Sequence, residues 1–368
     1  MNQKCKEISY KVRYIFIRIT KNKIIIIFLI NLILIFFLIK NYFIFKCCIK
    51  KNMNNQKFFE FYIEHQFDNL KTNEYINLDY ENINFAILKR TTCPDCGLFS
   101  YYIIYLGCIR KYMIEGYIPI IDLESFPNVF NGFNINSSRK NPWEIFFYQP
   151  FGYTIRNVMK RAKNINYFEC ENRNMRPNDD IFFDKKSMNL WHNIANKYIP
   201  IKNKIIKDSE NIIKKLFKDS TNVLGVLLRG TDYMTKKPYE HPIIPNTDNV
   251  IEDVIKMDNK NKYDFIFIAT EDNRIRNKFI NVKSLKNKLK YLIYEKNIDY
   301  NYTKKDYFAY NKNVIGNLEF VKIYLLNMLI LSKCIDIISA QTSGSIGVFI
   351  LSNGFRNNKV YNLGYYKL

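Results

Sequence analysis

The segment LGVLLRGTDY, residues 224–233, decides how this chain is interpreted. Residues 223–228 form an apolar run of strand length with β-branched members, which predicts a short buried strand. The run ends at Arg229 and Gly230. In an open α/β sheet, an arginine at the carboxyl end of a parallel strand faces the crevice where ligands bind. A neighbouring glycine lets the backbone approach that ligand closely. The alternative for Arg229 is a structural ion pair at the strand end.

Two later segments predict further strand ends of the same kind. In YDFIFIATED, residues 263–272, a buried strand is followed by Thr270, Glu271 and Asp272. In CIDIISAQTSGSIGV, residues 334–348, a strand is followed by a small polar turn and by a helix over residues 344–351. Because parallel strands end at the same edge of a sheet, these groups are expected near Arg229.

The polar turn of the third segment is suited to an anion. Thr342, Ser343 and Ser345 supply hydroxyl groups, and the helix start supplies backbone N–H groups that have no intrahelical partner. Unpaired donors and the helix dipole together favour phosphate, although a serine-rich start also caps a helix without any ligand. With an arginine on one strand end and an acidic pair on another, the segments together predict a nucleoside diphosphate site.

These motifs resemble the fucosyltransferase superfamily of GT-B glycosyltransferases, which includes core, Nod-factor and protein O-fucosyltransferases, and they are most similar to its capsule-type members. In the C-terminal half the resemblance rests on RGTDY (229–233), KPYEHP (237–242), ATED (269–272) and QTSGS (341–345). In the N-terminal half it rests on CGLFS (96–100), GYIPIID (116–122) and NPWEIFFYQPFGY (141–153). It therefore extends from about residue 85 to the C-terminus.

The resemblance implies which residues bind the donor. The arginine and serine that match Arg229 and Ser343 contact the donor's phosphates in the family. By the same resemblance, Asp272 is expected against the ribose or guanine. The remaining members of the expected donor site are Gly230, Thr342, Gly344 and Ser345.

The chain departs from the family pattern at Asn327, where the family carries an acidic residue on a helix expected over residues 318–331. A carboxylate there would accept both N–H donors of guanine, whereas an amide has one acceptor oxygen. The resemblance still places Asn327 at the nucleotide. Either the guanine contact is weaker, Glu319 or another group compensates, or the base is not guanine.

The residue that takes the acceptor's proton is less well defined. Core fucosyltransferases have a glutamate a few residues beyond the arginine, and strict spacing places Lys237 there. Asp232 and Glu240 are the candidate catalytic groups, and His241 is expected on the acceptor side. The structural alternatives are that Asp232 is a turn residue and that residues 240–242 form an ordinary solvated loop.

Composition limits the partners. A hydrophobic content of 48% is typical of a globular protein, and the formal net charge is +22. The lysines are scattered among many Asn, Ile, Tyr and Phe residues, so no nucleic-acid partner is expected, although the charge could serve anionic membranes or acidic glycans.

No Asp-x-Asp is placed to chelate a metal-nucleotide, and residues 178–180 (NDD) are expected in a solvated loop. Neither a metal nor another cofactor is expected, as in the resembled family.

The eight cysteines include the C-x-x-C pair Cys93 and Cys96. No second pair follows at zinc-ribbon spacing, so a structural zinc is not expected. Both thiols are expected in the loop after the first strand. The alternative, in an oxidising compartment, is a local disulfide.

The N-terminal segment predicts a membrane anchor. Residues 24–39 are apolar except for Asn31, and residues 42–45 extend the run if Lys40 snorkels. Seven Lys or Arg residues lie in 1–23 and five in 40–57, which favours a cytosolic N-terminus and a type II orientation. A cleaved signal peptide is disfavoured because no small-x-small site follows. The expected location is a Golgi- or ER-like membrane in a eukaryotic host and the inner membrane in a bacterial one.

The domains follow from these boundaries: a basic tail (1–23), an anchor (24–45), a stem (46–82), an N-terminal acceptor-side α/β domain (83–205) and a C-terminal nucleotide-sugar-binding Rossmann-like domain (206–368). Strands alternating with helices predict parallel, doubly wound sheets. In the second domain strands are expected at 223–228, 263–269, 290–294, 334–339 and 359–363. In the first, strands are expected at 84–88 and 117–123, with helices at 98–115, 188–199 and 201–217 and a helix start at Asn141.

The expected fold is thus GT-B, with two Rossmann-like domains facing a cleft after one transmembrane helix. The expected function is a membrane-anchored, inverting glycosyltransferase that transfers fucose from GDP-fucose to a hydroxyl of a glycan or glycoconjugate. One alternative is the same fold with another nucleotide sugar. The other is a catalytically inactive relative that binds a glycan or nucleotide.

Overall fold

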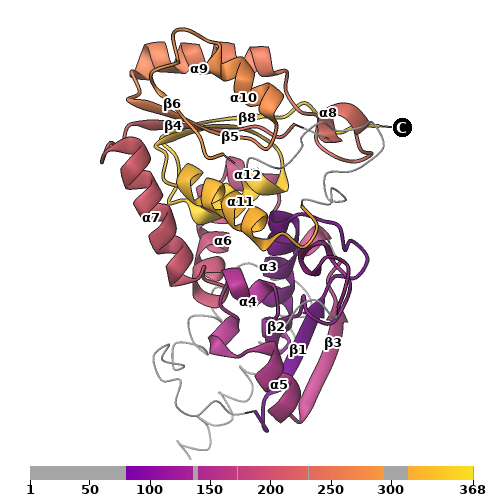
Figure 1. Cartoon of the computed structure of the whole chain (residues 1–368). Helices are drawn as coiled ribbons and strands as arrows, with labels where there is room; N and C mark the ends of the chain where they lie inside the picture. Colours follow the sequence, from indigo (N-terminus) through magenta and orange to yellow (C-terminus); the bar gives the residue numbers. More distant parts are fainter. Residues whose placement is uncertain (1–79, 136–139, 172, 231, 294–313, 368) are drawn as a thin grey trace, which may run out of the picture. The chain divides into compact units, whose positions relative to one another are not determined.

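The computed structural model describes residues 80–135, 140–171, 173–230, 232–293 and 314–367, which belong to one compact unit, Thr72–Leu368. These residues form an α/β structure built on parallel sheets (Figure 1). The expected basic tail, the anchor and nearly all of the stem lie outside the described residues. Within the described ranges, no helix combines the length and apolar character needed to cross a bilayer.

The smaller described sheet has the order β2-β1-β3, and all its pairs are parallel. Its strands are β1 (Asn84–Lys89), β2 (Ile118–Ile121) and β3 (Asn164–Glu169). The central strand β1 is buried along most of its length because it is paired on both sides. The sequence did not predict strand β3. Its sequence NINYFE is polar and largely exposed, so it lacks the continuous apolar run of a buried parallel strand.

Helices of the N-terminal half are α3 (Leu98–Ile114), α4 (Trp143–Phe146), α5 (Ile155–Arg161) and α6 (Lys185–Tyr198), with 3-10 turns η1 (Val129–Asn131), η2 (Pro150–Gly152), η3 (Arg173–Met175) and η4 (Asp179–Phe182). The helix start expected at Asn141 is misplaced by one residue, since Pro142 is the N-cap of the four-residue α4. Asn141 mainly serves the edge of β2. Its Nδ2 donates to Ile121 O at 2.7 Å, and its Oδ1 accepts from the Leu123 N–H at 3.1 Å. Unpaired backbone groups at a strand edge require such partners.

The larger described sheet has the order β6-β5-β4-β7-β8 and is parallel throughout. Its strands are β4 (Val223–Leu227), β5 (Phe265–Ala269), β6 (Leu289–Lys290), β7 (Asp336–Ala340) and β8 (Asn357–Tyr361). All the expected strands of this half are present, with ends shifted by a few residues. The chain leaves β4 in one direction to β5 and β6, then returns to place β7 on the other side of β4. The topological switch point therefore lies between β4 and β7.

Helices cover both faces of this sheet: α7 (Asn203–Phe217), α8 (Asp232–Lys236), α9 (Thr247–Asn261), α10 (Asn273–Ile280), α11 (Leu318–Leu331) and α12 (Ser343–Leu351). Helices α9 and α10 pack through Val250, Val254, Ile275 and Phe279 on one face, while α11 contacts β4 and β5 (Figure 1). Gly225 in β4 permits this approach, because a Cβ there would lie 2.9 Å from Leu331 Cδ2. The expected doubly wound, parallel arrangement of this half is confirmed.

Helix α12 also packs against α3 and α6 of the N-terminal half. At Gly347 a Cβ would lie 1.9 Å from Cδ1 of Phe99, so only glycine fits this contact. Helix α12 is therefore held against α3 and α6 as well as against α11. The domain boundary expected between residues 205 and 206 falls inside α7.

Candidate functional site

The carboxyl ends of β4, β5 and β7 lie next to one another. Leu227 pairs with Ala269 of β5, and Val226 pairs with Ile338 of β7. Residues that follow these strands by similar distances therefore emerge at one edge of the sheet. The segments 229–230, 270–272 and 341–345 are brought together as expected, beside the switch point where open α/β sheets bind ligands.

Gly230 is required by the close approach of the β4 and β5 ends. A Cβ on Gly230 would lie 2.5 Å from both Cβ and Oδ2 of Asp272. The Gly230 N–H donates to Glu271 Oε1 at 3.0 Å, which holds the backbone in place. The residue that Gly230 accommodates in this structure is therefore Asp272.

The Asp272 carboxylate is 3% exposed and has structural partners. It is the N-cap of α10, and its Oδ1 accepts from the Arg274 N–H at 2.8 Å. The Arg274 side chain also pairs with it, with a nitrogen–oxygen distance of 2.5 Å. Asp272 therefore fixes the β5 end, and its contact with the ribose or guanine stays a prediction.

Arg229 lies over the ring of Tyr233, which in turn contacts the ring of His241. Its guanidinium carbon lies 4.3 Å from the centroid of the Tyr233 ring, and that ring meets the His241 ring edge-on at 5.2 Å. A guanidinium over an aromatic face is attracted by the ring quadrupole. Tyr233 therefore links Arg229, which is expected at the donor phosphates, to His241, which is expected on the acceptor side. The sequence did not single out Tyr233.

The loop that carries Glu240 and His241 is pinned by the C-terminal tail. The Glu240 N–H donates to Tyr366 O at 3.1 Å, and the Tyr366 N–H donates to His241 O at 2.9 Å. Both side chains are exposed, and His241 Nδ1 lies 2.9 Å from Tyr239 O. An Nδ1–H that donates to this carbonyl would leave Nε2 as an acceptor. The loop is thus held in one position.

The structure also gives the positions of Asp232, a candidate catalytic group, and of Asp179, which was not a candidate. Asp232 is the first residue of α8, directly after the Arg229 turn. Asp179, expected in a solvated loop, instead accepts a hydrogen bond at 3.2 Å from the Tyr365 hydroxyl of the C-terminal tail. Burial raises the pKa of Asp179 above its ordinary value.

At the start of α12 the hydroxyl groups have different roles. Thr342 Oγ1 accepts from the Ser345 N–H at 3.2 Å, and Ser345 Oγ donates to Ala340 O at 2.5 Å. Thr342 and the fully buried Ser345 therefore build the turn. Ser343 is partly exposed, and the N–H groups of Ser343 and Gly344 stand in the first helical positions, which have no intrahelical acceptor. Ser343 is the hydroxyl best placed for an anion.

Tyr324 of α11 is a site residue that the sequence did not indicate. A Cβ on Gly344 would lie 2.8 Å from its hydroxyl oxygen, so the hydroxyl lies directly against the start of α12. Burial raises the pKa of Tyr324 well above the ordinary tyrosine value, while the positive charge of Arg229 opposes the rise. The hydroxyl is therefore neutral at physiological pH and can donate.

Asn327 lies one turn beyond Tyr324 on the same helix. It is 1% exposed, and its Nδ2 donates to Ile323 O at 2.9 Å, within α11. Tyr324 is an α11 side chain that reaches the start of α12. A contact of Asn327 with the nucleotide stays a prediction.

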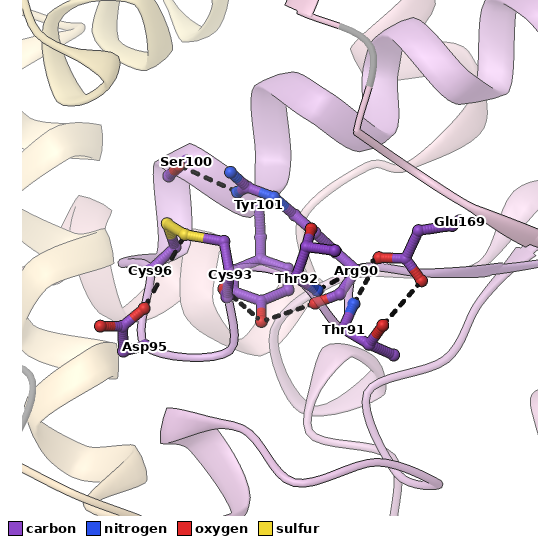
Figure 2. Close-up of a disulfide and its surroundings, with 9 residues drawn as sticks. All are labelled: Arg90, Thr91, Thr92, Cys93, Asp95, Cys96, Ser100, Tyr101 and Glu169. Carbon is purple, nitrogen blue, oxygen red and sulfur yellow. Dashed lines mark hydrogen bonds between the residues drawn. A yellow bond between two sulfur atoms is a disulfide. The ribbon is translucent and has the colours of Figure 1, made fainter. Parts of the chain in front are cut away.

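The smaller sheet also ends in charged residues (Figure 2). Glu169 at the end of β3 accepts from the Thr91 N–H at 2.5 Å and from the Thr91 hydroxyl at 3.0 Å. Arg90 donates to Ser100 Oγ at 2.9 Å and lies over the Tyr101 ring. Glu169 thus joins the ends of β3 and β1, while Arg90 binds the first turn of α3.

The thiols of Cys93 and Cys96 are joined in a disulfide in the loop after β1 (Figure 2). The expectation of separate thiols there is wrong, and the alternative of a local disulfide holds. Asp95 lies close enough to both sulfurs to form a three-ligand cluster, but bonded sulfurs are not the thiolates that a metal needs. A further disulfide joins Cys108 of α3 to Cys170, which follows β3.

No protein-family model matches the sequence, and none of the curated proteins compared with it does. Solved structures are similar in fold. NodZ α-1,6-fucosyltransferase soaked with GDP-fucose is 13% identical and has a TM-score of 0.42, over 74% of this chain and 93% of that one. Fucosyltransferase NodZ from Bradyrhizobium is also 13% identical, with a TM-score of 0.41 over 74% and 94% of the chains. POFUT1 in complex with GDP is 9% identical, with a TM-score of 0.42 over 77% and 99%.

Proposed function

We propose that this chain is an inverting glycosyltransferase that transfers fucose from GDP-fucose to a hydroxyl of a glycan or glycoconjugate. One observation carries the proposal: Arg229 and the Ser343 start of α12 follow the neighbouring strands β4 and β7 at the switch point of a parallel sheet, within motifs that resemble fucosyltransferases. A guanidinium stays charged and matches phosphate oxygens with two parallel donors. A helix N-terminus adds N–H donors and the positive end of its dipole.

In this proposal the donor's diphosphate gains negative charge as the glycosidic bond breaks. Arg229 and the Ser343 hydroxyl and N–H face that charge, and the neutral Tyr324 hydroxyl is a further donor beside Gly344. Groups that are already oriented toward developing charge lower the barrier without having to reorganise. The positive potential opposite the diphosphate comes from Arg229 and α12, so the proposal includes no metal.

The acceptor hydroxyl must lose a proton as the new bond forms. The pinned loop supplies Glu240 and His241 for this role, and Asp232 is the third candidate. His241 is favoured among them as an acceptor-side group, because its ring contacts the Tyr233 ring, over which Arg229 lies. A neutral imidazole with Nδ1 hydrogen-bonded to Tyr239 O would present Nε2 to the acceptor.

In this proposal the chain is a type II membrane protein, and its catalytic part lies in an oxidising lumen. The disulfides Cys93–Cys96 and Cys108–Cys170 support this placement, because such bonds persist in secretory compartments and are rare in the cytosol. Protease treatment of sealed microsomes tests it. Protection of the catalytic part until detergent is added is expected, and digestion without detergent would contradict the orientation.

Nucleotide binding tests the function. Saturating GDP should raise the melting temperature of the full-length chain, since a ligand at a hundredfold its Kd stabilises by about 2.7 kcal/mol. UDP is the matched control, and a shift with UDP alone would assign another nucleotide sugar. Incubation with GDP-fucose should then release GDP. Binding without any release or transfer would identify an inactive relative instead.

A further inference from the structure

A cavity of about 380 Å³ lies in the N-terminal half, apart from the strand ends that form the proposed donor site. Its walls come from residues 140–157 and from Lys202, and they include Glu144, Ile145, Tyr148 and Arg156. Ligand pockets in proteins have volumes of roughly 300–1,000 Å³. The cavity is therefore large enough for a sugar residue and larger than an inorganic anion requires.

The wall that joins Tyr148 to Lys202 is rigid. The Tyr148 N–H donates to Pro200 O at 2.8 Å, and the Lys202 N–H donates to Phe146 O at 2.9 Å. These paired backbone bonds hold the segment after α4 against the start of α7. As a result the Lys202 ammonium lies 3.7 Å from the centroid of the Tyr148 ring. A cation beside an aromatic wall is thus present before any ligand binds.

The cavity has more positive than negative charge. Glu144 is engaged, since its Oε1 accepts from Gln149 Nε2 at 3.1 Å and from the Ile155 N–H at 2.9 Å. Arg156 pairs with Glu124, outside the cavity lining, at 2.6 Å. Lys140 and Lys202 also line the cavity, and neither forms an ion pair with another described residue.

The Lys202 ammonium is the more informative of these two cations. It is partly buried, and burial lowers the pKa of Lys202 below the ordinary lysine value, with Glu144 opposing the change. A cation that has lost part of its hydration without gaining a carboxylate partner is stabilised by an anion that enters from solvent.

We propose that this cavity binds an anionic sugar residue of a glycan, with its acidic group on Lys202 and Lys140 and its ring against Tyr148 and Ile145. The glycan part of the inference rests on the proposed function. The charge and the aromatic wall rest on the cavity alone. A carboxylate and a sulfate share the required chemistry, so both belong in the test.

Calorimetric titration of the full-length chain tests the proposal with three probes: a hyaluronan tetrasaccharide for carboxylate, a chondroitin sulfate tetrasaccharide for sulfate, and neutral chitotetraose. At least one acidic probe should bind about tenfold more tightly than the neutral one, because hydrogen bonds to charged groups are the strong ones. Equal affinity for all three, or no binding, would overturn the proposal.

Charge-removing variants locate the binding. Lys202→Gln should weaken binding of the acidic probe about tenfold, and Lys140→Gln should weaken it less, because Lys140 is exposed whereas Lys202 is partly buried. Lys204→Gln is the matched control, since it removes the same charge two residues away, from an exposed position that does not line the cavity. An equal loss in all three variants would indicate general attraction to the +22 chain and would contradict the site.

GDP affinity separates this inference from the proposed function. The Lys202→Gln and Lys140→Gln variants should keep the GDP-induced rise in melting temperature, because neither residue lies at the donor strand ends. A chain that binds GDP and no acidic glycan would refute the cavity assignment alone. A chain that binds the acidic probe through Lys202 and ignores GDP would refute the donor assignment alone.

Discussion

The two described sheets share a topology but differ at their switch points. In each sheet the chain leaves a central strand in one direction and returns to its other side, so β1 and β3 flank one crevice and β4 and β7 flank the other. Across the first crevice Glu169 binds Thr91. At the second, Arg229 lies over Tyr233, and the partly exposed Ser343 begins α12. The same backbone arrangement is therefore closed by side chains in one sheet and remains suited to an anion in the other.

The difference shows that charge at a strand end does not by itself mark a binding site. At the ends of β1 and β2, Lys89 Nζ lies 3.6 Å from Asp122 Oδ2, and Asp122 Oδ1 also accepts from the Ser125 N–H at 3.0 Å. Such groups stabilise their own loops. A helix N-terminus with a partly exposed hydroxyl, at the same sheet edge as an arginine, has the additional donors that an anion requires. Substitutions in each of the two regions should therefore have different effects.

The largest effect is expected from the Cys108–Cys170 disulfide of the smaller sheet, whose Cys170 directly follows β3. Cys108 and Cys170 are 62 residues apart, so replacing both with serine should lower the free energy of unfolding by about 4 kcal/mol under the chain-entropy model. The Cys93→Ser, Cys96→Ser pair is the control. Cys93 and Cys96 are only 3 residues apart in sequence, so the loss of stability should be clearly smaller. Urea denaturation measures both, and equal losses would contradict the entropic explanation.

The next effect distinguishes the arginines of the two sheets. Arg229→Lys should lower transfer 10²- to 10³-fold, about 2.7–4 kcal/mol of barrier, because lysine lacks the two-pronged donor, while the melting temperature should change little. Arg90→Lys should do the reverse. Arg90 is 7% exposed and donates to Ser100, so its variant should lose stability before it loses activity. If Arg229→Lys keeps most of its activity, Arg229 is a structural residue like Arg90.

A smaller effect is expected from the glycine beside Arg229. Gly230→Ala places a methyl group 2.5 Å from Asp272, and overpacking of this kind costs about 1–3 kcal/mol of stability. Gly97→Ala, at the N-cap of α3, meets nothing within 4 Å and should lower the unfolding midpoint less than Gly230→Ala does. Thermal unfolding of the two variants gives the comparison. A stable Gly230→Ala variant would mean that the β4 and β5 ends are farther apart than described.

How far the sequence predicted the structure depended on local pattern. Strands of the larger sheet were predictable because buried parallel strands are continuous apolar runs, and the groups that follow them were predictable because parallel strands end together. Strand β3 was not, since its exposed polar residues have no such run. The Cys108–Cys170 bond was not predictable either, because a pairing over 62 residues leaves no local signal.

The sequence singled out residues near the ends of β4, β5 and β7 only where polar residues interrupt apolar runs. Arg229, Asp272 and Ser343 stand out in this way. Tyr324 does not, because it lies in a helix that is apolar around most of its circumference, and its contact with Gly344 exists only in three dimensions. Conversely, Asn327 is conspicuous in the sequence of that helix, yet its side chain bonds to Ile323 O of its own backbone.

The smallest effect tests that missed residue. Tyr324→Phe removes one neutral hydroxyl beside Gly344 and keeps the ring that packs on Phe99 at 5.8 Å, so the fold should be unchanged. If the hydroxyl donates to the donor's diphosphate, transfer should fall by a factor of about 2–10, which corresponds to a neutral hydrogen bond of about 0.5–1.5 kcal/mol.

Because burial raises the pKa of Tyr324 above 10.0, the hydroxyl stays protonated below that pH. Wild type and variant should therefore have parallel pH–rate profiles between about pH 6 and pH 9, separated by a constant factor. Profiles that converge within this range would show that Tyr324 ionises there and that its role is not that of a neutral donor.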